Sequence, residues 1–178
     1  MNHYKKKLHD LYAPVSFISL NQKLIERYKG IHDSSINRYT LYCIITLFHN
    51  IVVDIGMVFD SAKRTSSFIK FNQYIKFEKL RINDSEEWTK LFDSTFRKVK
   101  PFIDLRKKFH AHKNAQFEIN EFWEQHSEEC DKIPMIAENC IKLFDILSQE
   151  ILGYKLSFNS SENDIINQFD LIFSKYDS

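Results

Sequence analysis

The sequence predicts an all-α protein, an up-and-down helical bundle of about five or six helices. Two observations lead to this expectation. Only three glycines and three prolines occur in 178 residues, so the chain offers few of the turns that many short strands require. Its Lys, Ile, Leu, Phe and Glu residues also fall in long uninterrupted blocks, which favour helices.

The first helix is expected over residues 2–30. Pro14 should interrupt it or mark a restart, because proline lacks a backbone N–H and clashes with the preceding turn. Gly30 is a plausible C-cap, since glycine readily adopts the left-handed conformation that ends many helices.

A long, largely apolar helix is expected next, over about 35–59. Thr46, Asn50 and Asp54 recur every four residues along it and form one narrow polar stripe. An aspartate inside a membrane is costly, so the stripe favours the central helix of a soluble bundle over a membrane span. The stripe itself is either a thin strip facing solvent or a polar wall facing a functional groove.

Two helices are expected between residues 60 and 112. A short one covers 68–80, and a long amphipathic one covers 85–112, with Ser85 and the acidic residues after it as a good helix start. Pro101 should kink the long helix or mark a restart. A polar, acidic stretch follows at 116–131.

The last two helices are expected at 133–153 and 160–176. Pro134 suits the first turn of the former, and Gly153 suits its end. We therefore expect one all-α domain over 1–178, with a core at 35–153 and helical extensions at 1–34 and 154–178.

The overall composition is that of an ordinary globular protein. The net charge is +1 and 28% of residues are charged, so a generally basic nucleic-acid coat is excluded and any basic feature must be local. Cys43, Cys130 and Cys140 are odd in number and lack a CxxC spacing, which indicates neither a disulfide framework nor a zinc ribbon. The basic N-terminus lacks a following apolar segment, so a cytoplasmic protein is expected.

One stretch, residues 97–113, is strongly basic. It holds seven Lys and Arg residues against one acid, Asp104, and such a concentration suits a polyanion. The alternative is a merely solvated helix face. The basic residues are Arg97, Lys98, Lys100, Arg106, Lys107, Lys108 and Lys113.

Arg106 differs from the other basic residues in its position. On a helix it lies roughly 20° from Val99, on the apolar stripe that also carries Phe102 and Phe109. A buried arginine needs a partner, so this turn must reach an ion pair, a groove or another subunit. Asp54 is an available partner if the role of Arg106 is structural.

The same stretch carries a family signature. Leu105-Arg106-Lys107-Lys108-Phe109-His110-Ala111-His112-Lys113-Asn114 resembles the Leu-Arg-Asn-Lys-x-x-Ala-His-x-Asp signature of HEPN domains, especially the abortive-infection U-like branch. The resemblance covers roughly residues 35–153. Two positions depart from it: Lys107 stands where the family usually has Asn, Asp or His, and Asn114 replaces the usual acid.

The resemblance implies a ribonuclease in which two protomers bring their Arg–His motifs together, commonly as a toxin with a cognate antitoxin or in phage defence. Helix geometry agrees with a homodimer, because His112 lies roughly 120° around and 9 Å along the helix from Arg106. A two-fold axis can supply the missing partner.

The residue types suggest the chemistry. His112 would take a proton from an RNA 2′-OH and Arg106 would hold the scissile phosphate, without metal or cofactor. Asn50 and Asp54 are expected to support these two residues. The expected RNA-binding residues are Lys107, Lys108, His110, Lys113 and Asn114.

Three alternatives stay open at this point. The chain could be a non-catalytic HEPN module that binds RNA or nucleotides or mediates protein association, which Lys107 favours. It could be a plain helical scaffold in which Arg106 is structural. His110 and His112 could also bind a metal with His126 or Cys130, although residues two apart on a helix face different ways.

Overall fold

The computed structural model describes residues 2–29, 38–62, 65–111, 128 and 131–156. Within these ranges the chain forms five helices and no strand, which confirms the all-α prediction. The helices are α1 (Asn2–Lys29), α2 (Arg38–Val58), α3 (Phe68–Lys76), α4 (Ser85–Ala111) and α6 (Ile133–Leu152).

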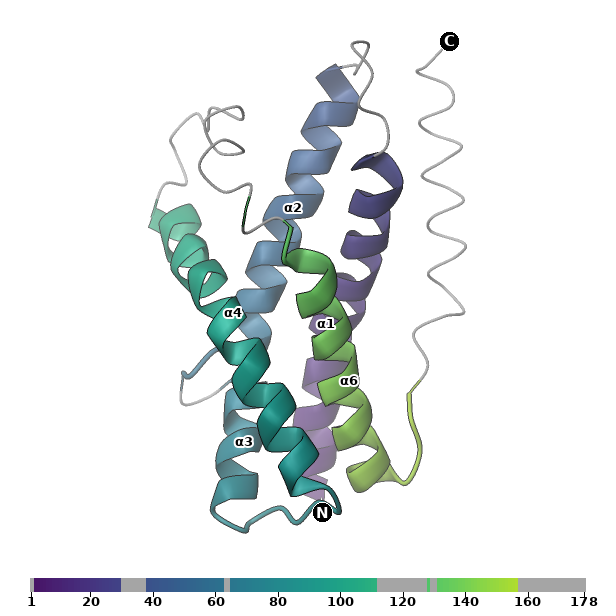
Figure 1. Cartoon of the computed structure of the whole chain (residues 1–178), viewed down its shortest axis with the longest axis vertical. Coiled ribbons are helices and arrows are strands. Elements are labelled where there is room, and N and C mark those ends of the chain that lie inside the picture. The colour runs from purple at the N-terminus through teal and green to yellow at the C-terminus, as the bar shows by residue number, and fades with distance from the viewer. Residues whose placement is uncertain (1, 30–37, 63–64, 112–127, 129–130, 157–178) are drawn as a thin grey trace.

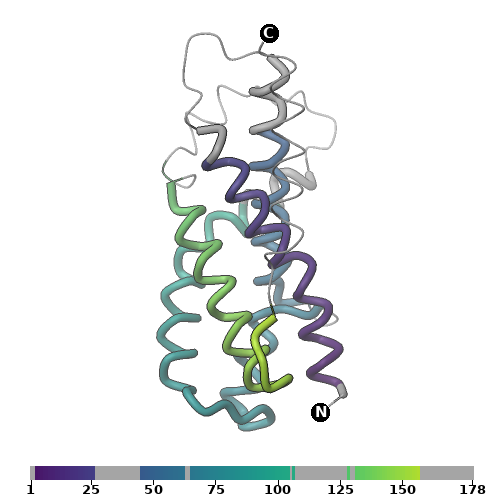
Figure 2. The backbone as a smooth tube through the Cα atoms, turned by 90° about the vertical axis from the view of Figure 1, so that its right-hand side faces the viewer, coloured from purple at the N-terminus to yellow at the C-terminus, as the bar shows by residue number. Residues whose placement is uncertain are grey.

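The four long helices form an elongated bundle. Helix α1 packs against α2 and α6, and α4 packs against the same two helices, while the short α3 packs against α4. Figure 1 shows α1 and α4 running in one direction and α2 and α6 in the other, and Figure 2 shows the same bundle from the side. This is the expected up-and-down arrangement.

The core lies along the centre of this bundle, where each long helix contributes fully buried side chains. Leu11 and Ile18 of α1, Ile55 of α2, Phe102 of α4 and Phe144 of α6 are all inaccessible to solvent. Aromatic rings fill the end near α3. They include Phe59, Phe68, Trp88, Phe92 and Phe96, whose neighbouring ring centroids lie 5.4–6.5 Å apart. Such burial offsets the entropy lost in ordering these helices.

The two prolines at which a helix break was expected lie inside continuous helices. Helix α1 continues through Pro14 and α4 continues through Pro101, so neither residue starts a new helix. An internal proline costs about 3 kcal/mol. Val15 and Phe102, which directly follow the two prolines, are fully buried, and burial of this kind offsets the cost.

The helix ends agree with local chemistry, with one shift. The cap of α4 is Asp84, whose Oδ1 accepts a hydrogen bond from Glu87 N at 2.8 Å, and the expected Ser85 is the first helical residue. Helix α6 ends at Gly153 in the left-handed conformation (φ 84°), as predicted. Asp is as good a cap as Ser, so the sequence left the two equally suitable.

Several expectations fall on residues that lie outside the described ranges. They include the C-cap at Gly30, most of the acidic stretch at 116–131 and the last helix at 160–176. Of the helices that the structure describes, none combines the length and apolarity needed to cross a membrane.

Candidate functional site

The second half of α4 presents basic side chains on its outer surface. Arg97 and Lys100 are exposed, and Arg97 Nε donates to Asp93 O of its own helix at 3.2 Å. Lys98 is half-buried, with its Nζ 3.1 Å from Met135 Sδ of α6. Arg97 and Lys100 therefore lie on the outside of this half of α4.

Arg106 sits on the side of α4 that faces α2. Val99 and Phe102, on the preceding turns of that side, are fully buried, but the Arg106 side chain keeps 25% of its surface exposed. Its Nη1 donates to Gly56 O of α2 at 3.0 Å. The expected position of an arginine on the apolar stripe is therefore observed, at the α2–α4 contact.

Gly56 makes this contact possible. A Cβ at position 56 would overlap Arg106 Cδ and would lie 3.3 Å from Arg106 Cβ and Cγ. Gly56 is buried within the last turn of α2, and a glycine inside a helix costs about 1 kcal/mol relative to alanine. The absence of a side chain lets the aliphatic part of Arg106 lie against the α2 backbone.

Asp60, just after α2, is the acidic partner of Arg106. Its Oδ2 lies 3.4 Å from Arg106 Nη1, and its side chain is 26% exposed. Its Oδ1 accepts a hydrogen bond from Ala62 N at 2.8 Å, and its backbone O accepts one from Ser67 Oγ at 2.6 Å. Because Ser67 also caps α3, this network joins α2, α3 and α4 around Arg106.

The guanidinium group of Arg106 is only partly satisfied. Arginine has five N–H donors. Within the described part of the chain, Arg106 Nη1 bonds to Gly56 and Asp60, while Nε is buried without a partner. Charge-assisted N–H···O bonds are usually 2.7–2.9 Å long, so the ion pair at 3.4 Å is a loose one. Since Nε itself is inaccessible, an anion can meet this guanidinium only at the exposed quarter of the side chain.

Asn50 and Asp54 do not join this network. They line a groove between α2 and α1, together with Phe17 and Leu20 of α1. Asp54 precedes Gly56 by two residues, which is roughly 200° around the helix from the side that meets Arg106. The structural partner of Arg106 is therefore Asp60, and not Asp54 as the sequence suggested.

The groove shapes the ionisation of Asp54. Burial raises the pKa of this carboxyl to about 6, because removal from water disfavours the charged form. Asn50 and Thr46, on the same stripe, are exposed. The stripe thus faces solvent at Thr46 and lines the groove at Asn50 and Asp54.

The remaining predicted site residues cannot be placed around Arg106. His112, Lys113 and Asn114 lie outside the described residues, and for Lys107, Lys108 and His110 only the helical backbone is described. The possible metal ligands His126 and Cys130 also lie outside. Within the described ranges, no group of three or more His, Cys, Asp or Glu residues is arranged to hold a metal ion.

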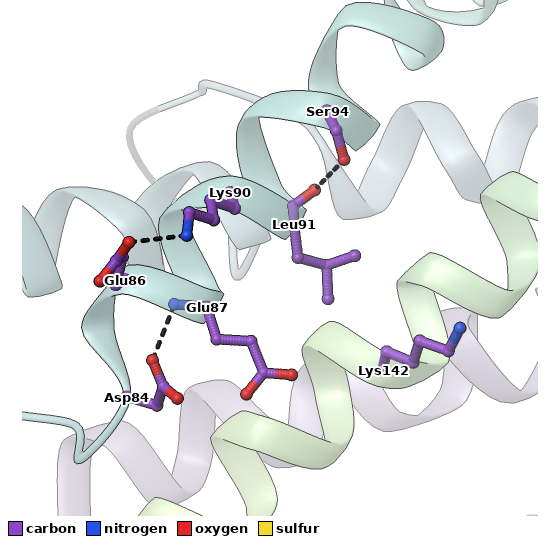
Figure 3. Close-up of a pocket in the computed structure, with 7 residues that line it drawn as sticks. All are labelled: Asp84, Glu86, Glu87, Lys90, Leu91, Ser94 and Lys142. Atoms are coloured by element: carbon purple, nitrogen blue, oxygen red, sulfur yellow. Dashed lines mark hydrogen bonds and ion pairs between the residues drawn. The ribbon is translucent and has the colours of Figure 1, made fainter.

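A second groove, of about 610 Å³, lies at the other end of α4 (Figure 3). Glu87 of α4 and Lys142 of α6 line it from different helices, and a 2.6 Å ion pair joins Lys90 to Glu86. Asp84 adds a third carboxylate. The lining thus holds three carboxylates against the two ammonium groups of Lys90 and Lys142.

Sequence reasoning missed Gly56 and Asp60. A lone glycine within a long apolar helix is a signal for close packing, and Asp60 directly follows such a helix. Comparisons with protein-family models, curated proteins and solved structures found no match to this chain.

Proposed function

We propose that the chain is a metal-independent endoribonuclease of the HEPN type that acts as a homodimer. Arg106 holds the scissile phosphate, and His112 is the general base. The cellular role that goes with this activity is that of a toxin or phage-defence effector in the cytoplasm, with a cognate antitoxin as a possible partner.

The state of Arg106 carries the proposal. Asp60 and Gly56 fix one nitrogen of its guanidinium, its Nε has no partner within the described residues, and a quarter of the side chain is exposed. A purely structural arginine would be expected to use more of its donors. An arginine held in place with donors to spare is suited to bind a phosphate as charge builds on it.

The reaction follows from these two residues. The RNA 2′-oxygen attacks phosphorus while the bond to the 5′-oxygen breaks, His112 accepts the 2′ proton, and the 5′-oxygen takes a proton from solvent. Arg106 stabilises the negative charge on the non-bridging oxygens. The products are a 2′,3′-cyclic phosphate and a 5′-hydroxyl, and DNA is inert because it lacks the attacking hydroxyl.

Incubation of the purified protein with end-labelled RNA in EDTA tests the activity. Arg106→Ala and His112→Ala should each reduce cleavage by about 10²-fold or more. Arg97→Ala is the matched control, because Arg97 is an exposed arginine on the same helix and its Nε donates to the backbone of that helix. Equal loss in all three variants, or loss of wild-type cleavage in EDTA, would contradict the proposed roles.

The second candidate is a non-catalytic HEPN module that binds RNA. Lys107, in place of the usual Asn, Asp or His after the motif arginine, favours it, because an ammonium group supplies phosphate affinity without a catalytic function. A salt-dependent shift of labelled RNA with no 2′,3′-cyclic phosphate product would identify this function.

A further inference from the structure

A mostly apolar groove of about 380 Å³ runs along the outside of the bundle between α1 and α2. It is lined by Phe17, Leu20, Asn21, Leu24, Leu47, Asn50, Val53 and Asp54. The Phe17 side chain is 53% exposed, and Met57, one turn after Val53, is 43% exposed. A patch of large exposed apolar side chains on a protein surface usually marks an interaction site.

The chain itself contains a segment suited to this groove. Residues 157–178 follow the last described residue, Leu156. Five apolar residues within them recur at the spacing i, i+4, i+7, i+8, i+11, which places them on one face of a helix, whereas Asn167 falls on the opposite face. The five are Ile165, Phe169, Ile172, Phe173 and Tyr176. We propose that residues 160–176 form an amphipathic helix that docks in the α1–α2 groove.

The segment begins at the correct end of the bundle. Figures 1 and 2 both place the end of α6 beside the beginning of α1. The rings of Tyr12 and Phe144, with centroids 6.0 Å apart, fix the register of these antiparallel helices. Since Phe144 is eight residues before Leu152, the end of α6 lies level with the first turns of α1.

The segment is also long enough. A helix over 160–176 spans roughly 25 Å at 1.5 Å per residue. From the level of the end of α6, the groove residues Phe17 to Leu24 lie roughly 20–30 Å along α1 by the same measure. A helix that runs beside α1 from that level brings its last turn, Phe173 to Tyr176, roughly 20–24 Å along α1 and level with the groove.

A segment of the same chain is favoured over a second copy of the protein. Only residues 157–159 separate Leu156 from the proposed helix, and a short linker gives an effective concentration in the millimolar range. A separate molecule at micromolar concentration would have to displace this segment. The groove is thus assigned to the chain's own C-terminal segment.

Cysteine labelling of the full-length chain tests the proposal. Val53→Cys places a thiol of similar size in the groove, and Glu138→Cys on the exposed surface of α6 is the reference. Cys43 and Cys130 are replaced by Ser in every variant. Cys140 is kept, because it is fully buried and its thiol reacts only if the bundle opens.

The labelling rate of the Val53→Cys thiol is compared in three backgrounds. Phe169→Asp with Phe173→Asp should increase it by about tenfold or more, since two charges prevent docking on an apolar surface. Asn167→Asp, on the opposite face, should leave it unchanged. The reference thiol at position 138 should label at the same rate in all three.

Two results would overturn the proposal. One is a rate at position 53 that the double substitution does not change. The other is protection that increases with protein concentration, which would assign the groove to a second copy. If Cys140 becomes reactive in the double variant, Phe169→Ser replaces it, with a smaller increase expected while Cys140 stays unreactive.

Discussion

Arg106 of α4 lies directly across Gly56 of α2, with its Nη1 3.0 Å from Gly56 O and its aliphatic chain in the space that a Cβ at position 56 would fill. Arg106 thus packs against the one glycine of the described α2. Position 56 therefore controls how Arg106 is held.

Gly56→Ala is expected to destabilise the protein by about 1–3 kcal/mol, because the new methyl group overlaps Arg106 and packed interfaces resist added volume. In an Arg106→Ala background the same substitution should be neutral or stabilising by up to about 1 kcal/mol, since alanine is the better helix former. Urea unfolding of the four proteins in this double-mutant cycle measures the coupling. Additive effects would show that the two residues do not meet.

Asp60→Asn is expected to reduce RNA cleavage more than stability. The amide keeps an acceptor for Ala62 N but loses the charge that orients Arg106. Because the ion pair is partly exposed and long, its loss should cost about 1 kcal/mol or less of unfolding free energy. Cleavage rates and urea unfolding, measured on the same preparation, separate the two effects. A large loss of stability with unchanged cleavage would make the pair purely structural.

Asp54→Asn is expected to stabilise the protein at pH 8 and to have little effect at pH 4. Burial raises the pKa of the Asp54 carboxyl from 3.8 to about 6. The folded state therefore binds this proton more tightly than the unfolded state, and the stability it contributes is lost as the pH rises through about 6. Urea unfolding at both pH values tests this, with the exposed Asp93→Asn as control. If Asp54→Asn changes the free energy of unfolding more at pH 4 than at pH 8, burial does not raise the pKa of Asp54 as stated.

Replacement of Lys107, Lys108 and Lys113 by Gln is expected to weaken RNA binding equally for all sequences. Flexible ammonium groups meet phosphates as point charges and carry no base-edge information. The slope of log affinity against log salt should flatten by up to about 2, while circular dichroism stays unchanged. An unaltered slope would show that RNA runs elsewhere on the protein.

The helical architecture was predictable because its signals are local. Few glycines, long apolar periodicities and a glycine at position 153 all act within one helix, and the structure confirms them. Proline is also a local signal, but no new helix starts at Pro14 or at Pro101. Pro14 and Pro101 break helices locally, but long-range burial of neighbouring side chains such as Val15 and Phe102 keeps α1 and α4 continuous.

The site was predictable only in part. The apolar stripe of α4 correctly indicated that Arg106 faces another element, because that stripe depends on one helix alone. Its partner depends on the register between α2 and α4, which no pattern within either helix specifies. Asp54 and Asp60 were equally suitable by charge, and the structure brings Asp60 to Arg106 while Asp54 faces α1.

The proposed composite active site, shared by two protomers, is tested most directly by mixing Arg106→Ala and His112→Ala proteins, each inactive alone, and allowing their subunits to exchange. A mixed dimer has one site with both an intact Arg106 and an intact His112, contributed by different protomers. Since half of randomly exchanged dimers are mixed, cleavage of labelled RNA in EDTA should return to about a quarter of the wild-type rate. A mixture that stays inactive, although both proteins are folded and exchange subunits, would contradict the composite site.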